Sequence, residues 1–125
     1  MSEIPDNLKY TEDHEWIELK DGEARYGITD YAQDELGDIV YVELPQIGDE
    51  INKGDMLGVI ESVKTVSDLY APISGTVKEV NGDLEGAPEI VNEDPYREGW
   101  IVVMEIADEK ELDGLLEPEE YEDIL

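Results

Sequence analysis

Short runs of β-branched and aromatic residues, separated by glycine or proline, recur through the middle of the chain. The first run, "IVYVEL" at residues 39–44, ends at Pro45. Four more follow: "GVIESV" at 58–63, "TVSDLY" at 65–70, "APISGTVKEV" at 71–80 and "GWIVVMEI" at 99–106, with breaks expected at Gly48, Gly54, Gly58, Pro72, Gly75 and Gly99. Short strands with such punctuation are typical of a small barrel or sandwich. The chain is therefore predicted to be mainly β.

A hairpin is predicted before these runs. The segments "HEWIELK" at 14–20 and "EARYGI" at 23–28 flank the pair Asp21-Gly22, and a D-G pair between extended segments is a strong hairpin signal. The acidic segment "NGDLEG" at 81–86 is likewise expected to be a hairpin turn, since it lacks the full pattern of a calcium-binding loop.

A few short helices are predicted at the periphery. Asp30 and Gln33 have the spacing of a capping box at the start of a helix, and Gly37 provides its stop. Residues 107–125 are rich in good helix formers, and Pro118 suits the first turn of a final helix. Two short helices are expected to close the chain.

Length and cysteine content limit the kinds of site that the chain can build. Its 125 residues fit one domain, so residues 1–125 are expected to form a single unit with a modest core. The sequence contains no cysteine, which excludes disulfides, zinc-thiolate sites and cysteine nucleophiles. Redox chemistry would have to come from a bound or attached group.

The charge of the chain excludes two classes of partner. Thirty-five acidic residues against eight Lys and Arg give a formal charge of -27, which repels nucleic acids and anionic membranes. The charge indicates either a surface that binds cations or an adaptation to concentrated salt, where screening weakens self-repulsion. The acids are scattered through every segment, which favours a halophilic origin.

The ends of the chain give no targeting signal. "MSEIPDNLKY" lacks a basic stretch followed by an apolar one, and no 18 consecutive residues are apolar. A cytoplasmic protein without a membrane span is the expectation.

Lys64 stands alone among apolar residues. Val63 precedes it and Thr65 follows it, at the junction of two predicted strands. Most lysines at such junctions are solvated hairpin residues. The alternative is a lysine presented on a rigid hairpin for acylation by another enzyme, which would remove its charge and create a long arm.

The segments around Lys64 resemble one family. "DIVYVELP", "GDEINKGDMLGVIESVKTVSDLYAPISGTVKEVN" and "NEDPYREGW" are similar to the H protein of the glycine cleavage system, and the similarity extends from "KYTEDHEWI" to "EEYEDIL". This resemblance implies the fold class: a mainly β, lipoyl/biotinyl-carrier-like barrel-sandwich hybrid of two small sheets, with short peripheral and C-terminal helices.

The resemblance also implies a set of site residues. In this family the lysine of the E-S-V-K motif carries lipoate through an amide bond, and the matching residue is Lys64. Glu61 is expected to help the lipoate-attaching enzyme recognise the hairpin. Glu15 and Asp68 are the candidate carboxylates of a cleft that receives the loaded arm.

The implied function is that of a non-catalytic shuttle. The lipoyl arm would carry the aminomethyl group of glycine from the pyridoxal-phosphate glycine decarboxylase (P protein) to the folate-dependent aminomethyltransferase (T protein). A dihydrolipoamide dehydrogenase (L protein) would then reoxidise the arm. No nucleophile elbow, phosphate-binding loop or metal-ligand set in the sequence indicates an independent enzyme.

Three alternatives remain open at the level of sequence. The chain could be a lipoyl or biotinyl domain of a ketoacid dehydrogenase or carboxylase, although biotin sites usually place methionines beside the lysine. It could be an H-like relay that passes lipoate to other enzymes. It could also be an unmodified acidic interaction domain or cation buffer, with Lys64 free.

The remaining polar and aromatic candidates are assigned structural roles. His14 is the only histidine, and no second nitrogen or sulfur ligand is near it in the sequence, so a metal site is not predicted. Trp16, Trp100, Tyr41 and Tyr70 are expected to be core or cleft-wall aromatics, because the cationic groove of a nucleic-acid site is missing.

Overall fold

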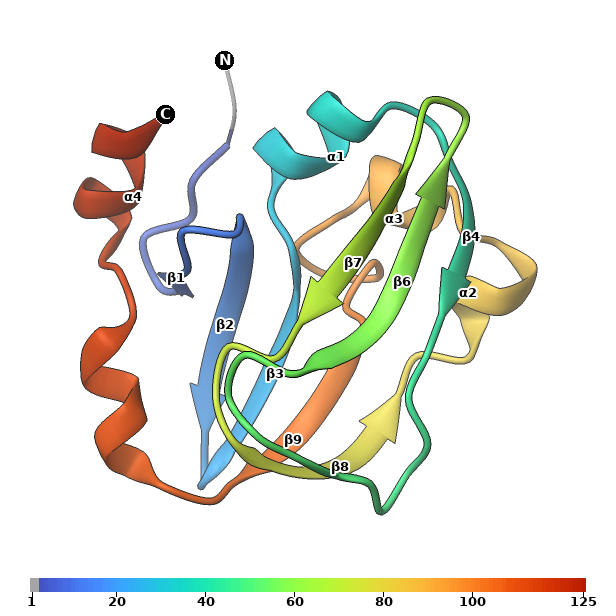
Figure 1. Ribbon diagram of the computed structural model, residues 1–125. Helices are drawn as coiled ribbons and strands as arrows, with labels where there is room; N and C mark the ends of the chain where they lie inside the picture. Colours follow the sequence, from blue (N-terminus) through green and yellow to red (C-terminus); the bar gives the residue numbers. More distant parts are fainter. Residues whose placement is uncertain (1–2) are drawn as a thin grey trace.

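The computed structural model describes residues 3–125 and contains two antiparallel sheets (Figure 1). The larger has six strands in the order β1-β2-β3-β9-β8-β5, and the smaller has three in the order β4-β6-β7. The six-stranded sheet consists of β1 (Lys9–Tyr10), β2 (Glu15–Lys20), β3 (Glu23–Ile28), β5 (Glu50–Ile51), β8 (Gly75–Val80) and β9 (Val102–Ile106). The three-stranded sheet consists of β4 (Ile39–Glu43), β6 (Met56–Ser62) and β7 (Val66–Tyr70). The predicted fold class is confirmed.

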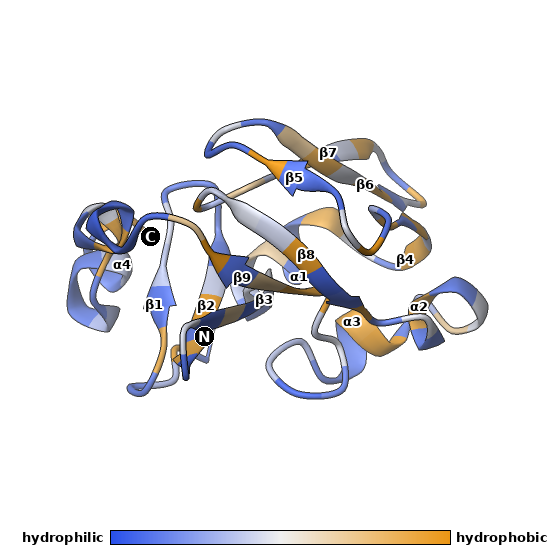
Figure 2. Ribbon diagram, turned by 90° about the horizontal axis from the view of Figure 1, so that it is seen from below, coloured by the Kyte–Doolittle hydropathy of each residue, from blue (hydrophilic) through white to orange (hydrophobic). Residues whose placement is uncertain are grey.

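The core lies between the two sheets. In the view from below, β6 and β7 lie on one side and β3, β8 and β9 on the other (Figure 2). The core side chains come from both layers and include Tyr26, Ile60, Leu69, Val77 and Met104, all buried. Alternation of inward apolar residues along each strand brings them together, because successive side chains of a strand point to opposite faces.

The predicted hairpin at residues 14–28 is present. Strands β2 and β3 pair from Glu15 opposite Ile28 to Lys20 opposite Glu23. Asp21 and Gly22 have positive φ angles of 51° and 80°, which is the backbone of the type I′ turn that joins two strands with the right twist.

Gly58 does not break a strand, contrary to the prediction. It lies inside β6, where the pairing with β7 shifts register between Met56 and Gly58. A Cβ at this position would lie 2.2 Å from the carbonyl oxygen of Glu43. The glycine is therefore required by the close approach of β4, and a strand interior can contain one for this reason.

Helix α1 (Asp30–Leu36) forms where the sequence predicted it, with Gly37 after its last turn. The N-cap is Thr29 instead of Asp30, and its hydroxyl accepts a hydrogen bond from the Ala32 amide. Asp30 and Gln33 do interact, since the side-chain amide of Gln33 donates to the Asp30 carboxylate at 2.8 Å.

The segment at residues 81–86 corrects a prediction. It forms α2 (Asp83–Gly86), a short helix followed by α3 (Ile90–Glu93), instead of a hairpin turn. Leu84 and Val91 are buried from these helices, so burial of two apolar side chains prevails over the local turn signal of Asn-Gly-Asp.

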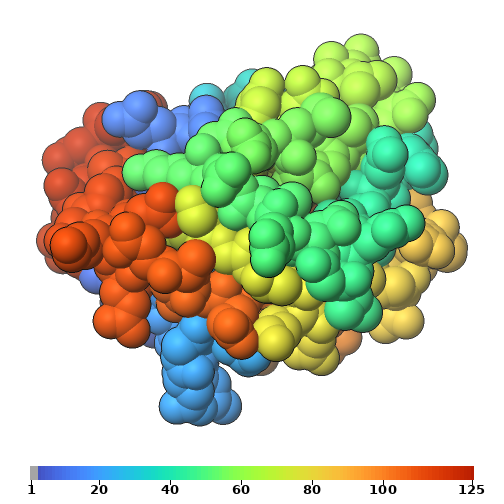
Figure 3. Space-filling model, turned by 60° about the horizontal axis from the view of Figure 1, so that its bottom comes forward, coloured from blue at the N-terminus to red at the C-terminus, as the bar shows by residue number. Residues whose placement is uncertain are grey.

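The chain closes with the 3-10 helix η1 (Glu109–Gly114) and the α-helix α4 (Pro118–Ile124). Helix α4 lies beside the N-terminal segment (Figure 1), and the rings of Tyr10 and Tyr121 stack at a centroid distance of 4.7 Å. On the face drawn in Figure 3, the orange C-terminal segment borders the green region that follows β4. None of the helices described between residues 3 and 125 is long and apolar enough to span a membrane.

Candidate functional site

The hairpin between β6 and β7 presents Lys64 at a well-defined tip. The Ser62 amide donates to the Thr65 carbonyl at 2.8 Å, and the Ser62 hydroxyl accepts from the amides of Lys64 and Thr65, each at 3.2 Å. The Val63 amide donates to the Asp38 carbonyl at 3.0 Å. The backbone of the tip is thus fixed from within and from the segment before β4, while Lys64 itself is exposed.

The Lys64 side chain lies close to the end of α1. A Cβ at Gly37 would be 3.1 Å from Lys64 Cε and 3.7 Å from Nζ. No carboxylate of residues 3–125 forms an ion pair with Lys64. The amine is therefore accessible to a reagent or an enzyme that approaches the tip.

A cleft of about 290 Å³ lies beside this hairpin, between α1, β7 and the loop before β2. Its apolar lining comes from Ile28, Ala32, Leu36, Ile60 and Leu69, and its polar lining from Asp13, His14, Glu15, Tyr31, Glu35, Ser67 and Asp68. The structure thus brings Glu15 and Asp68, two of the candidate residues, to the wall of one cleft.

Glu15 begins β2 and is almost completely buried, with 2% of its surface exposed. The Thr11 hydroxyl donates to its Oε1 at 3.2 Å. Burial raises the pKa of the Glu15 carboxyl from its usual value of 4.5 to about 8, because a carboxylate loses its hydration there. Glu15 is therefore largely protonated at neutral pH.

Asp68 has the opposite environment. It is exposed on β7, directly opposite Val59 of β6, and its carboxylate accepts a hydrogen bond from the Tyr70 hydroxyl at 3.3 Å. The two candidate carboxylates of the cleft thus differ in state: Asp68 is solvated and Glu15 is buried.

Glu61 does not belong to the cleft. It is exposed on β6, where it pairs with Tyr41 on one side and Val66 on the other. The three form one row across the three-stranded sheet, close to the Lys64 tip. Tyr41 is 48% exposed, so the prediction of a core or cleft-wall role for this tyrosine is wrong. Trp16 is fully buried, as expected.

Several cleft residues were not identified from the sequence. His14 lies at a φ of 66°, its ring is 4.8 Å from that of Tyr31, and its Nδ1 is 2.9 Å from the Tyr121 hydroxyl. Burial lowers the pKa of the His14 imidazole, against the opposing influence of Asp13 and Glu35. The only sequence signal was its proximity to Glu15. No group of three or more metal-ligating side chains was found in the described part of the chain.

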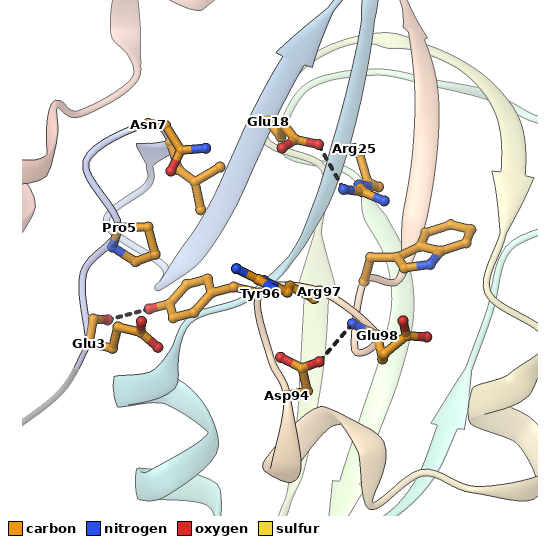
Figure 4. A pocket seen from close by; sticks show the side chains of 11 residues that line it. Glu3, Pro5, Asn7, Glu18, Arg25, Asp94, Tyr96, Arg97 and Glu98 are labelled. Atoms are coloured by element: carbon orange, nitrogen blue, oxygen red, sulfur yellow. Dashed lines mark hydrogen bonds and ion pairs between the residues drawn. The ribbon is translucent and has the colours of Figure 1, made fainter.

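A second, larger cavity of about 580 Å³ lies elsewhere; Trp100 lines it, but none of the four candidate site residues (Glu15, Glu61, Lys64 and Asp68) does. Figure 4 shows Arg25 and Arg97 on its wall, with Arg25 directed toward Glu18 and Tyr96 toward Glu3. Four carboxylates, those of Glu3, Glu18, Asp94 and Glu98, also line it. The two cavities differ in chemistry, since only the cleft beside Lys64 has a predominantly apolar wall.

The geometry combines an exposed amine with a nearby acidic cleft. A group attached to Lys64 could fold over the end of α1 toward the cleft, where apolar side chains would cover a hydrocarbon arm. Carboxyl groups at the wall could hold an ammonium, since charge-assisted hydrogen bonds are strongest away from water.

Comparisons with known proteins identify the family of the chain. The family model of the glycine cleavage H-protein matches residues 8–125. The glycine cleavage system H protein of Oceanobacillus iheyensis is 59% identical over 119 residues, covering 95% of this chain and 94% of that protein. The H protein of Carboxydothermus hydrogenoformans is 56% identical over 125 residues, covering 100% and 96%.

A solved structure is similar along nearly the whole chain. The crystal structure of a glycine cleavage system H protein from Mycobacterium marinum superposes with a TM-score of 0.87 at 40% sequence identity, covering 98% of this chain and 100% of that one. From the family model, the two relatives and this structure, the chain belongs to the glycine cleavage H-protein family.

Proposed function

We propose that this chain, as one domain of 125 residues, is the lipoyl-carrying shuttle of the glycine cleavage system. Lipoate is attached to Lys64, and the chain itself catalyses no reaction. The observation that carries the proposal is the position of Lys64: an exposed amine without an ion pair in residues 3–125, on a hairpin tip fixed by hydrogen bonds, beside an acidic cleft.

The residues around Lys64 fit a lipoyl arm. The Gly37 backbone leaves room for the arm to pass, because a Cβ there would already crowd the lysine side chain. The apolar wall formed by Ile28, Leu36 and Leu69 suits the hydrocarbon part of the arm. When attached, lipoate supplies a disulfide that takes up the aminomethyl group of glycine and is reduced as it does so.

Glu15 and Asp68 have distinct roles in this proposal. Asp68, at the solvated side of the cleft, attracts the ammonium of the cargo. Burial keeps the Glu15 carboxyl protonated at neutral pH, and an approaching cation stabilises its carboxylate and lowers its pKa. Binding of the ammonium therefore releases a proton from Glu15, and the resulting ion pair keeps the cargo away from water.

The partners follow from the shuttle role. The chain serves in turn glycine decarboxylase (P protein), aminomethyltransferase (T protein) and dihydrolipoamide dehydrogenase (L protein), and a lipoate-attaching enzyme modifies it beforehand. Glu61, in the exposed row with Tyr41 and Val66, is available for recognition by that last enzyme. Tethering the cargo raises its effective concentration at each site.

The test is the intact mass, with peptide mapping, of the protein purified from its native host. The expected result is a lipoyl-sized increment on Lys64. The variant Lys64→Arg should lose the increment, whereas Lys53→Arg, another lysine in a loop, should keep it. An unmodified Lys64 in cells with active lipoylation would overturn the proposal and favour an acidic interaction domain.

A second assay separates glycine cleavage from lipoate relay. The lipoylated protein should support glycine-dependent carbon dioxide exchange by glycine decarboxylase, and the Lys64→Arg variant should not. A protein that is lipoylated but inactive in this exchange, and that donates its lipoyl group to other acceptor domains, would be a relay.

The halophilic origin is part of the same proposal. Only three ion pairs join the described residues, one each at Lys9, Arg25 and Lys78, against a formal charge of -27. Most acidic side chains therefore face solvent without a cationic partner, and concentrated salt would screen their repulsion.

A further inference from the structure

Three side chains from separate parts of the chain, His14 before β2, Thr29 before α1 and Tyr121 on α4, form a row of hydrogen bonds behind the cleft. The Tyr121 hydroxyl on α4 lies 2.7 Å from Thr29 Oγ1 and 2.9 Å from His14 Nδ1. Thr29 Oγ1 also accepts from the Ala32 amide at 3.2 Å. Thr29 and Tyr121 are fully buried, so the hydrogen of each hydroxyl requires an acceptor inside the protein.

The positions of the hydrogens follow from the available acceptors. Within residues 3–125, the Thr29 hydroxyl has no acceptor other than the Tyr121 oxygen. Tyr121 must then donate its own hydrogen to His14 Nδ1. The reverse direction, from Nδ1 to Tyr121 to Thr29, would leave the Thr29 hydrogen buried without an acceptor, which is unfavourable. Nδ1 is therefore an acceptor, and the neutral ring carries its hydrogen on Nε2.

The backbone holds the His14 ring at the cleft. His14 has a φ of 66°, its amide donates to the Thr11 carbonyl at 3.1 Å, and its carbonyl accepts from the Thr29 amide at 3.0 Å. Nε2 forms no hydrogen bond with the described residues and is not among their buried unpartnered atoms. Among the described residues Nε2 therefore has no hydrogen-bond partner, and the side chain to which it belongs lines the cleft.

We propose that Thr29 and Tyr121 hold His14 as its neutral Nε2–H tautomer and thereby keep a positive charge out of the cleft that receives the ammonium cargo. The functional part of this inference rests on the proposed carrier role. Tyr121 and Thr29 are positioning residues, since they act through His14. Helix α4, which lies behind the cleft wall, therefore influences the cargo site without lining it.

The charges around His14 show why such a device is needed. Asp13 and Glu15 flank it in the chain, Glu35 and Tyr31 face it from α1, Asp68 lies across the cleft on β7, and Tyr121 contacts it from α4. The carboxylates of Asp13 and Glu35 alone would favour an imidazolium, which would neutralise them and repel an ammonium. Burial and the direction of the hydrogen bonds oppose that protonation.

The test measures the tautomer directly. His14 is the only histidine of the chain, so its ring nitrogens can be assigned in a long-range proton-nitrogen NMR spectrum of the unmodified protein without ambiguity. The expected spectrum has an unprotonated Nδ1 and a protonated Nε2 near neutral pH. A protonated Nδ1 would overturn the inference, whatever the state of Lys64.

Two matched variants separate the hydroxyl from the ring. Tyr121→Phe keeps the aromatic packing but removes the hydrogen bond to His14. This variant should raise the titration midpoint of His14 by at least half a pH unit, and its neutral ring should be a mixture of the Nδ1–H and Nε2–H tautomers. Tyr31→Phe removes a hydroxyl from the other ring that packs on His14, and should leave the titration and the tautomer unchanged. Equal behaviour of the two variants would contradict the proposed role of Tyr121.

The effect on the cleft can be measured with methylammonium chloride as the probe. The expected result is at least threefold weaker binding to Tyr121→Phe than to the unsubstituted protein at a pH where His14 is protonated only in the variant. Equal binding would refute the electrostatic role. Because the probe and the NMR signals need no lipoyl group, a failure of lipoylation at Lys64 would count against the proposed function alone.

Discussion

The Lys64 side chain lies over the backbone of Gly37, so closely that a Cβ at Gly37 would be 3.1 Å from Lys64 Cε. Gly37 ends α1 with φ 81° and ψ -159°, a backbone conformation that is essentially restricted to glycine. The residue that terminates the helix therefore also leaves the space in which the proposed lipoyl lysine rests.

Gly37→Ala should affect both stability and modification. The backbone conformation is expected to cost about 1–3 kcal/mol of the free energy of unfolding, and the added methyl group should displace the Lys64 side chain. We expect slower acylation of Lys64 by a lipoate-attaching enzyme, measured as initial rates by intact mass.

Gly48→Ala is the matched control for this substitution. Gly48 has a similar φ of 96°, but a Cβ there would have nothing within 4 Å. This variant should lose stability without any change in the rate at Lys64. If both variants slowed acylation equally, the effect would be due to general destabilisation and not to the contact with Lys64.

Local signals explain which parts of the fold could be predicted. The Asp21-Gly22 turn and the end of α1 at Gly37 depend on one or two residues with special backbone angles, so the sequence contains the whole cause. The segment at residues 81–86 has equally good turn residues but forms a helix, because Leu84 is buried in the core. That burial depends on the packing of distant strands.

The cleft was only partly predictable for the same reason. Glu15 and Asp68 were placed by resemblance to a family, and the structure brings both to one cleft wall. The hydrogen bond between His14 and Tyr121 joins residues 107 positions apart, and no local pattern indicates it. The exposure of Tyr41 was missed because a β-propensity signal does not tell which face of a sheet is covered.

Glu15→Gln should change the pH dependence of stability. The folded-state pKa of Glu15 is raised to about 8 by burial, from a usual value of 4.5. Between these values the unfolded chain binds fewer protons than the folded one, so the contribution of Glu15 is complete below about pH 4.5 and is lost as the pH rises through 8. The slope is at most about 1.4 kcal/mol per pH unit.

Urea denaturation at pH 5 and pH 8 measures this effect. Gln resembles the protonated carboxyl, so the variant should match the unsubstituted protein at pH 5 and exceed it by about 1–3 kcal/mol at pH 8. Glu61→Gln, which removes one acid at an exposed position, controls for the change in net charge. A constant difference between the unsubstituted protein and Glu15→Gln at both pH values would contradict the role of Glu15 burial.

Gly58→Ala should destabilise the three-stranded sheet. The new Cβ would lie 2.2 Å from the Glu43 carbonyl oxygen, which is backbone and cannot turn away, so β4 would have to separate from β6. We expect a loss of about 3 kcal/mol in the free energy of unfolding, at the upper end of overpacking costs. Gly86→Ala, where a Cβ has nothing within 4 Å, should change stability by less than about 1 kcal/mol.

Dilution of salt should unfold the protein if its acidic surface is an adaptation to concentrated salt. With a formal charge of -27 and few ion pairs among the described residues, repulsion between carboxylates should grow as the Debye length increases from roughly 3 Å at 1 M to about 10 Å at 0.1 M. The measurement is the thermal midpoint by circular dichroism across a potassium chloride series, and it should fall steadily on dilution.

A parallel series in sucrose, which favours compact states without screening charge, distinguishes charge screening from a general stabilisation of the compact state. If sucrose restores the midpoint as fully as potassium chloride does, screening is not the cause. A midpoint that is the same from molar to millimolar salt would contradict the halophilic origin.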